Sequence, residues 1–111
     1  MHHPAFSFVP EEPRRGAPGG RLNGWAIPVK DSTAVAGFTT TDGNPARARV
    51  AVKDDPLTRA LLAAGADIPA LTLTSELGAT CYAERPGVPV LESPAYPGRT
   101  PGGSSAGAAV A

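Results

Sequence analysis

This chain of 111 residues contains one cysteine and few aromatic side chains, and its formal net charge is zero. The single cysteine, Cys81, excludes an intrachain disulfide framework and forms no zinc-binding pattern. Ten Lys and Arg balance ten Asp and Glu, so the charge gives no indication of binding to nucleic acid or to an anionic membrane. No apolar run approaches the length of a membrane span, and the N-terminus lacks a secretory signal. We therefore expect a cytoplasmic protein that binds neither nucleic acid nor membrane.

Glycine and proline, by contrast, are abundant, with 13 residues of each. They predict much irregular structure, and the core should be thin because much of the apolar content is alanine. Prolines and glycines interrupt every period within residues 1–21, which we interpret as a flexible tail. Phe6 and Phe8 alternate within this tail and could add an edge strand to the domain that we expect over residues 22–111.

One helix is clearly predicted, over residues 55–64. An aspartate, Asp54 or Asp55, would cap its start, Pro56 suits its first position, and Gly65 would end it. The apolar residues that recur at helical spacing, and should therefore form the buried face, are Leu57, Leu61 and Ala64.

Shorter elements surround this helix. Apolar runs predict strands over residues 25–29 and 66–73, and a short helix could begin after Ser75. Residues 84–103 should form a long surface loop, and loops of that length are usually functional. We expect this loop to be anchored by Val88 and Val90, and the nearby Cys81 to be a small buried residue.

The tripeptide Val-Lys-Asp occurs twice, with its lysine at Lys30 and at Lys53. Lys53 precedes two aspartates and a helix start, which predicts a solvated surface residue. Lys30 ends an apolar strand, where partial burial would disfavour the ammonium form, as a lysine base requires. The neighbouring Asp31 would favour the charged form, so a structural and a catalytic role both stay open for Lys30.

The chain ends in a turn that leads into an alanine-rich run. Pro101, Gly102 and Gly103 precede the serine pair Ser104 and Ser105, and the run that follows predicts a helix. A flexible Gly/Ser linker is one interpretation. Acyl or phosphoryl chemistry is the other, since a serine at a helix start can accept a backbone N–H and the helix N-terminus favours negative charge.

Four motifs in one order carry a resemblance to a known family. They are the first Val-Lys-Asp, the helix end Leu-Leu-Ala-Ala-Gly-Ala, the segment Thr-Ser-Glu-Leu-Gly, and Arg-Thr-Pro-Gly-Gly-Ser-Ser-Ala-Gly-Ala-Ala. In this order the chain from about Gly24 to Ala111 resembles the amidase signature family. The resemblance implies an α/β fold, a mixed sheet flanked by helices, of which this chain would hold the N-terminal part.

The resemblance also implies an activity: hydrolysis of the carbon–nitrogen bond of linear amides through an acyl-enzyme, by a Ser–cisSer–Lys triad. It places the base at Lys30 and the bridging serine at Ser104, with Ser105, Gly102 and Gly103 supporting the site. The acyl nucleophile would be a third serine, in a later Asp-x-Gly-Gly-Ser loop that these 111 residues do not contain. The substrate would be a small-molecule amide, and neither a metal nor an organic cofactor is implied.

The sequence departs from the family's motifs at two places, and these differences affect which type of amidase we expect. Ala106-Gly107 replaces the usual Gly-Gly, and the region around Ser75 and Glu76 lacks the acidic, asparagine-rich signature of the glutamyl-tRNA amidotransferase branch, which favours a stand-alone hydrolase. Without the nucleophile, the chain alone should be inactive, and a homodimer or a complementing C-terminal fragment is a possible partner. The alternatives are a non-catalytic family remnant that acts as an interaction protein, and a product that folds poorly.

Overall fold

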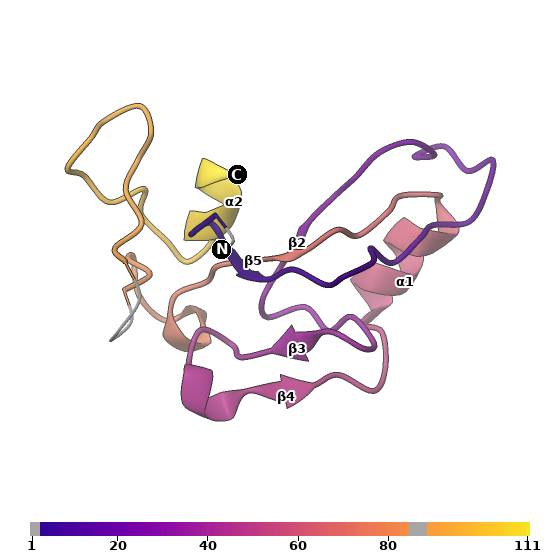
Figure 1. Ribbon diagram of the computed structural model, residues 1–111, viewed down its shortest axis with the longest axis horizontal. Coiled ribbons are helices and arrows are strands. Elements are labelled where there is room, and N and C mark those ends of the chain that lie inside the picture. Colours follow the sequence, from indigo (N-terminus) through magenta and orange to yellow (C-terminus); the bar gives the residue numbers. More distant parts are fainter. Residues whose placement is uncertain (1–2, 85–88) are drawn as a thin grey trace.

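A computed structural model describes residues 3–84 and 89–111 of the chain. Figure 1 shows short strands, short helices and long connecting segments. In chain order, the elements are β1 (Phe6–Phe8), β2 (Val29–Lys30), β3 (Thr39–Thr40), the 3₁₀ helix η1 (Pro45–Arg47), β4 (Arg49–Val50), α1 (Pro56–Ala63), β5 (Leu71–Thr72), the 3₁₀ helix η2 (Glu76–Gly78) and α2 (Ala106–Val110).

The central feature is a three-stranded mixed sheet in the order β1-β5-β2. Strand β5 pairs antiparallel with β1 and parallel with β2, where Val29 lies opposite Leu71 and Lys30 opposite Thr72. Strands β3 and β4 form a separate antiparallel pair. The α/β fold with a mixed sheet is therefore confirmed, and so is the edge strand at Phe6 and Phe8.

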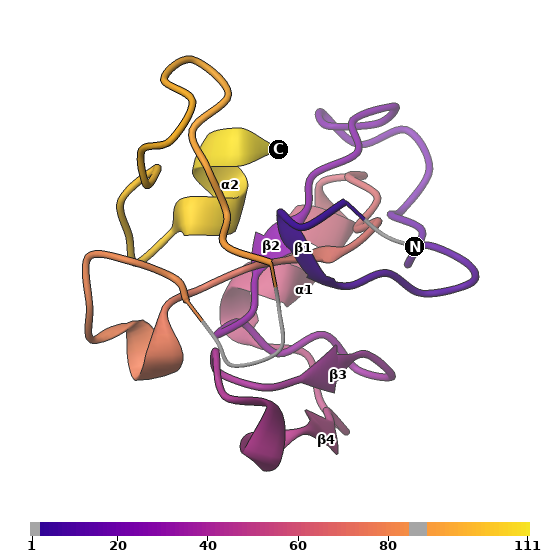
Figure 2. The same cartoon turned by 60° about the vertical axis from the view of Figure 1, so that its left-hand side comes forward.

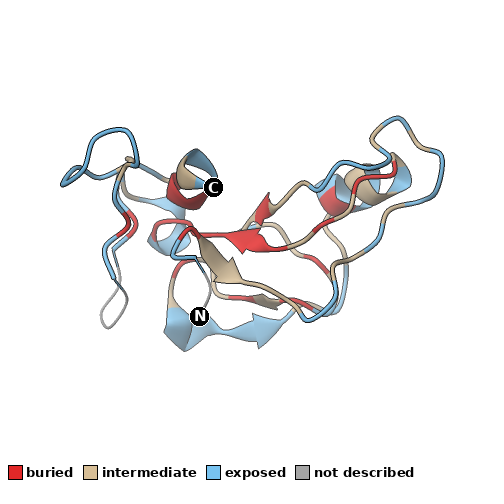
Figure 3. Cartoon of the chain, turned by 45° about the horizontal axis from the view of Figure 1, so that its top comes forward, coloured by how far each residue is buried: buried red, intermediate tan, exposed pale blue. Residues whose placement is uncertain are grey.

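Two apolar clusters pack around this sheet. Figure 2 shows α2 and α1 near the sheet, and Figure 3 shows that the sheet carries much of the buried part of the chain. The larger one joins Val29 and Leu71 to α1 through Leu61 and Leu62. Because side chains alternate along a strand, the next residues, Lys30 and Thr72, face away from this cluster. The smaller cluster contains Leu73, Leu91 and Ala106, so that α2 packs against β2 and β5.

Helix α1 begins and ends close to its predicted limits, but its buried face differs from the prediction. The Asp55 carboxylate accepts a hydrogen bond from the Leu57 amide at 2.9 Å and caps the helix, as expected. Leu57, however, is 53% exposed, and Thr58 is buried with its hydroxyl donating to the Ala34 carbonyl at 2.8 Å. The bond to residue 34 turns the helix so that Thr58, not Leu57, faces the core.

The two predicted strands are shorter in the structure. Between residues 25 and 29 only β2 and an isolated bridge from Ala26 to Asp67 remain, and Trp25 is 64% exposed. Proline carries no N–H, so Pro28 and Pro69 interrupt the ladder between that bridge and β5.

The predicted tail, in its described part, packs on the rest of the chain. Arg14 forms a bridge with Ile68, and its guanidinium binds the Asp54 carboxylate through two hydrogen bonds of 3.0 Å. These bonds, together with one from the Ala36 amide, lower the pKa of Asp54 below its ordinary value. This part of the chain therefore packs on the rest of the domain, while the flexibility of the tail and the division after residue 21 stay predictions.

The long loop has a different anchor from the one predicted. Val88 lies outside the described residues, and Val90 is 56% exposed. Leu91 is 3% exposed and packs in the smaller cluster, because that cluster offers an apolar surface on Leu73 and Ala106. Cys81, expected to be buried, is exposed.

Candidate active site

The structure brings Lys30 and Ser104 together from positions 74 residues apart. Lys30 ends β2, is half-buried, and places its Nζ atom 2.6 Å from Ser104 Oγ. The reason lies in the strand register: Val29 faces the larger cluster, so Lys30 faces the opposite side, where the turn before α2 lies. The other lysine of a Val-Lys-Asp tripeptide, Lys53, is exposed, as predicted.

The turn that carries Ser104 requires its glycines. Gly102 has φ of 85°, a left-handed conformation that favours glycine. A Cβ atom on Gly103 would lie 2.9 Å from the Thr80 carbonyl oxygen and 3.0 Å from the Tyr82 nitrogen, so only glycine allows this close approach. The peptide bond between Gly103 and Ser104 is cis.

Backbone contacts fix Ser104 from two further sides. Its carbonyl oxygen accepts a hydrogen bond from the Ser75 amide at 3.2 Å, and its Oγ lies 4.0 Å from the Cβ position of Gly78. Immediately after the turn, the Gly107 amide donates to the Leu73 carbonyl at 2.9 Å, which holds the start of α2 on β5. Ser75 is absent from the predicted site, and its place directly before the Glu-Leu-Gly segment is the sequence signal that points to it.

Ser105 has a different position from its neighbour. It is exposed and precedes α2, but its side chain does not cap the helix. The expectation that a serine of the pair accepts a backbone N–H at the helix start is therefore wrong for Ser105, whose ψ of 46° departs from the extended conformation usual at an N-cap.

The surroundings of Lys30 are polar and largely uncharged. Thr72 lies opposite Lys30 in the sheet, and the hydroxyls of Thr72 and Thr74 are buried without a hydrogen-bond partner in the described part of the chain. Among those residues Lys30 makes no ion pair, because the carboxylate of Asp31 is directed to Thr40 and Thr41.

An amine paired with a hydroxyl can move a proton between the two. A neutral lysine accepts the hydroxyl proton, and the serine oxygen can then accept a proton from a further group.

Within residues 3–84 and 89–111, no cluster of three His, Cys, Asp or Glu could hold a metal ion. No helix in that part of the chain is long and apolar enough to cross a membrane.

Fold and site together describe an α/β protein with a lysine–serine pair at the end of a parallel strand. Comparison with known proteins then gives the family: the model of the Amidase family matches residues 9–111, and the chain belongs to this family. The chain is 37% identical over 106 residues to Amidase 1 of Oryza sativa, covering 93% of this chain and 24% of that protein. It is also 37% identical to a glutamyl-tRNA(Gln) amidotransferase subunit from Haloarcula marismortui, with 92% of this chain and 24% of that protein covered.

Solved structures agree with the fold. The glutamyl-tRNA(Gln) amidotransferase subunit from Thermotoga maritima superposes with a TM-score of 0.82 and 26% identity, over 96% of this chain and 24% of that one. An allophanate hydrolase of Kluyveromyces lactis gives a TM-score of 0.67 at 24% identity, over 94% of this chain and 19% of that one, which shows the fold alone. The chain thus spans about a quarter of the length of these relatives.

Proposed function

We propose that this chain contributes the base half of an amide hydrolase site, with Lys30 as the base and Ser104 as the bridging serine. The observation that carries the proposal is the distance of 2.6 Å between Lys30 Nζ and Ser104 Oγ. Membership of the Amidase family supports an amide hydrolase at the level of reaction class. The matched relatives include both amidases and amidotransferase subunits, so a stand-alone hydrolase stays a prediction.

The proposed relay consists of two proton transfers, with Ser104 as the intermediate partner. Ser104 receives a proton from the attacking serine hydroxyl and gives its own proton to neutral Lys30. The activated oxygen attacks the amide carbonyl carbon, the carbon–nitrogen bond breaks, and the proton returns through the same pair to the leaving amine. Water then releases the acid from the acyl-enzyme. The relay requires Lys30 to be neutral when it accepts this proton.

The remaining parts of the proposal concern the setting of the site. Gly102 and Gly103 shape the turn, and Ser105 is proposed to support it by hydrogen bonding. The attacking serine belongs to an Asp-x-Gly-Gly-Ser loop that is not among these 111 residues. We propose a small linear amide as substrate, no cofactor, and a cytoplasmic location, with a complementing C-terminal segment or a second copy as partner.

The two Val-Lys-Asp tripeptides provide a matched test. The protein is expressed with the reading frame that follows the codon for Ala111, and hydrolysis of a panel of small amides is measured beside fluorophosphonate labelling of serine. Lys30→Ala and Ser104→Ala should each lower kcat by about 10² to 10⁴-fold, the usual contribution of proton-transfer catalysis. Lys53→Ala should change nothing, since Lys53 is exposed.

Two outcomes would overturn the proposal. If Lys30→Ala hydrolyses amides as fast as wild type, Lys30 is not the base. If the wild type neither hydrolyses amides nor reacts with the fluorophosphonate, the non-catalytic alternative, an interaction protein of the same family, gains the support.

A further inference from the structure

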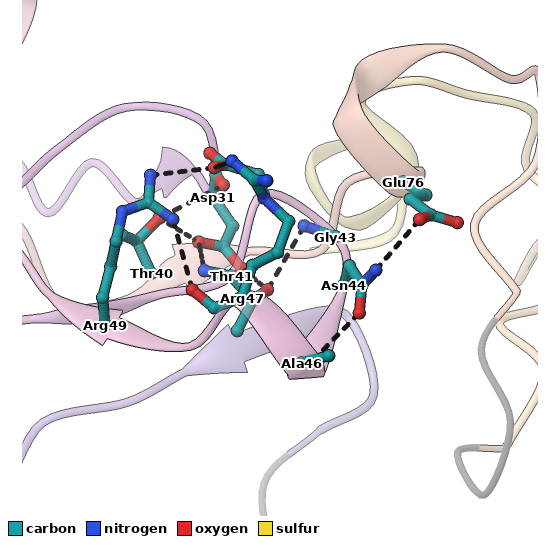
Figure 4. A network of polar contacts seen from close by, with 10 residues as sticks. Asp31, Thr40, Thr41, Gly43, Asn44, Ala46, Arg47, Arg49 and Glu76 are labelled. Carbon is teal, nitrogen blue, oxygen red and sulfur yellow. Dashed lines mark hydrogen bonds and ion pairs between the residues drawn. The ribbon is translucent and has the colours of Figure 1, made fainter.

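We propose that Asp31 is a positioning residue, which acts through Thr41 and the loop of residues 41–44 to hold Ser104 against Lys30. This inference rests on the proposed function of Lys30 and Ser104. Among the described residues, Asp31 forms a side-chain hydrogen bond neither to Ser104 nor to the lysine amine. It begins a chain of hydrogen bonds that leads to Ser104 from the other side, and Figure 4 shows the first part of this chain, from Asp31 to Glu76.

The first link is the Asp31 carboxylate, which is fully buried. It accepts hydrogen bonds from Thr40 Oγ1 at 2.7 Å, from the Thr41 amide at 2.9 Å and from Thr41 Oγ1 at 2.6 Å. A buried carboxylate is costly unless such donors compensate it, and short bonds to a charged acceptor are the strong ones. The carboxylate therefore fixes Thr41, at the start of the loop, relative to the end of β2.

The second link joins the loop to η2. The Asp42 carbonyl accepts a hydrogen bond from the Leu77 amide at 2.7 Å, and Asn44 Nδ2 donates to Glu76 Oε1 at 3.0 Å. Between them, a Cβ atom on Gly43 would lie 2.2 Å from the Ser75 carbonyl oxygen, so the two backbones are in contact.

Backbone conformation supports this second link. Asp42 and Leu77 have φ of 50° and 51°, in the left-handed region, which aspartate tolerates and which is unfavourable for leucine. The Leu77 amide donates its hydrogen bond to the Asp42 carbonyl, so the two left-handed residues meet where the loop joins η2. A leucine held in this conformation indicates that the surrounding structure keeps the loop and η2 in one defined arrangement.

The third link closes a ring. The Ser75 amide donates to the Ser104 carbonyl at 3.2 Å, and Gly78 of the same turn lies beside the Ser104 side chain. Ser104 Oγ is 2.6 Å from Lys30 Nζ, and Lys30 is covalently joined to Asp31. Each partner of the proton relay is thus tied to the same network, Lys30 through the backbone and Ser104 through η2.

A proton relay depends on this arrangement because its geometry is narrow. A hydrogen bond weakens steeply once its atoms separate or lose alignment, and a misplacement of about 1 Å can cost a reaction about 10²-fold. If the Asp31 carboxylate only stabilised the loop, its loss would lower the stability of the fold and leave the Lys30–Ser104 contact unchanged. If Asp31 is a positioning residue, its loss also changes that contact.

The chain contains only two lysines, Lys30 and Lys53, which allows a direct test. In protein labelled with ¹³C-lysine, the nuclear Overhauser cross-peak between Lys30 Hε and Ser104 Hβ reports the contact, and the exposed Lys53 serves as internal reference. Thr41→Val removes the hydroxyl that donates to Asp31, while Thr41→Ser keeps it. We expect Thr41→Val to weaken the cross-peak several-fold and Thr41→Ser to retain it.

Two further variants keep the test decisive. Asp54→Asn alters another carboxylate that accepts several hydrogen bonds, from Arg14 and from the Ala36 amide, but is not part of the network between Asp31 and Ser104. It should lower the stability of the fold and leave the cross-peak unchanged. Asn44→Ala removes two exposed bonds, the one to Glu76 and the one that Asn44 Oδ1 accepts from the Ala46 amide at the start of η1, and it should weaken the cross-peak without unfolding the chain, should Thr41→Val fail to fold. The proposal is overturned if Thr41→Val and Asn44→Ala keep the wild-type cross-peak, or if Asp54→Asn weakens it as much.

The cross-peak can be measured without catalytic turnover. The positioning role of Asp31 and the proposed amide hydrolase function can therefore be refuted independently. If Thr41→Val weakens the contact but Lys30→Ala still hydrolyses amides, the positioning inference stands and the proposed function does not. Where hydrolysis is measurable, Thr41→Val should lower kcat by about 10-fold with KM nearly unchanged, and Thr41→Ser should restore kcat.

Discussion

Gly107 is the position where a single methyl group should most disturb the candidate site. Gly107 lies in the first turn of α2, three residues after Ser104, and packs directly on the backbone of β5. In Gly107→Ala the new Cβ atom would lie 2.2 Å from the Leu73 nitrogen and 2.3 Å from the Ala5 carbonyl oxygen. Both are backbone atoms at the ends of β1 and β5 and are hydrogen-bonded to each other, so neither can move aside cheaply, and α2 must shift.

The size of the effect follows from three terms. Overpacking a tight site costs about 1–3 kcal/mol. Two hydrogen bonds at the contact, Leu73 amide to Ala5 carbonyl at 2.8 Å and Gly107 amide to Leu73 carbonyl at 2.9 Å, are each worth about 0.5–1.5 kcal/mol. The better helix propensity of alanine returns about 1 kcal/mol. Gly107→Ala should therefore lower the free energy of unfolding by about 1–5 kcal/mol, a large part of the total of a small domain.

Urea unfolding followed by circular dichroism measures this loss, and Ala108→Gly is the matched control. Ala108 is exposed in the same helix, so the reverse exchange there changes propensity without a clash and should cost about 1 kcal/mol. If Gly107→Ala instead stabilises the chain by the amount that Ala108→Gly removes, propensity alone decides and the packing argument is refuted. The shift of α2 should also move Ser104, and the Lys30–Ser104 cross-peak should weaken.

Two further predictions concern polar groups, one half-buried and one buried. Because Arg14 lowers the pKa of Asp54 in the folded state, the pair stabilises the chain above the ordinary aspartate value of about 3.8 and this stability is lost as the pH falls through the lowered pKa. Asp54→Asn should thus cost on the order of 1 kcal/mol at pH 7 and progressively less towards pH 3, measured by urea unfolding at each pH; an equal cost at both would contradict the assignment. Thr74→Val should leave the melting temperature unchanged or raise it, since its buried hydroxyl has no partner in the described part of the chain; a clear drop in a thermal scan would show that the hydroxyl is bonded.

Local chemistry made several features of this protein predictable. The helix of residues 56–63 could be recognised because a capping aspartate, a proline and a glycine act within one turn of the backbone. The edge strand at Phe6 and Phe8 followed from alternation alone. The family resemblance rested on the order of motifs, which is likewise a property of the sequence, and the Amidase match confirms it.

Other features depend on which segments meet. The burial of Thr58 in place of Leu57 depends on a hydrogen bond to a carbonyl 24 residues away, and no periodicity contains that partner. Leu91, not Val90, anchors the long loop because the apolar surface beside it comes from Leu73 and Ala106, both distant along the chain.

The Lys-Ser pair shows the division most clearly. The sequence by itself determined the two residue types, the apolar strand that precedes Lys30, and the glycines that permit the tight turn before Ser104. Only the tertiary structure decided that Lys30 Nζ and Ser104 Oγ lie 2.6 Å apart, since that distance depends on the parallel register of β2 with β5 and on the packing of α2 against both. It also decided that the Asp31 carboxylate turns to Thr40 and Thr41 and not to Lys30, because a buried charge takes the donors that the fold brings within reach.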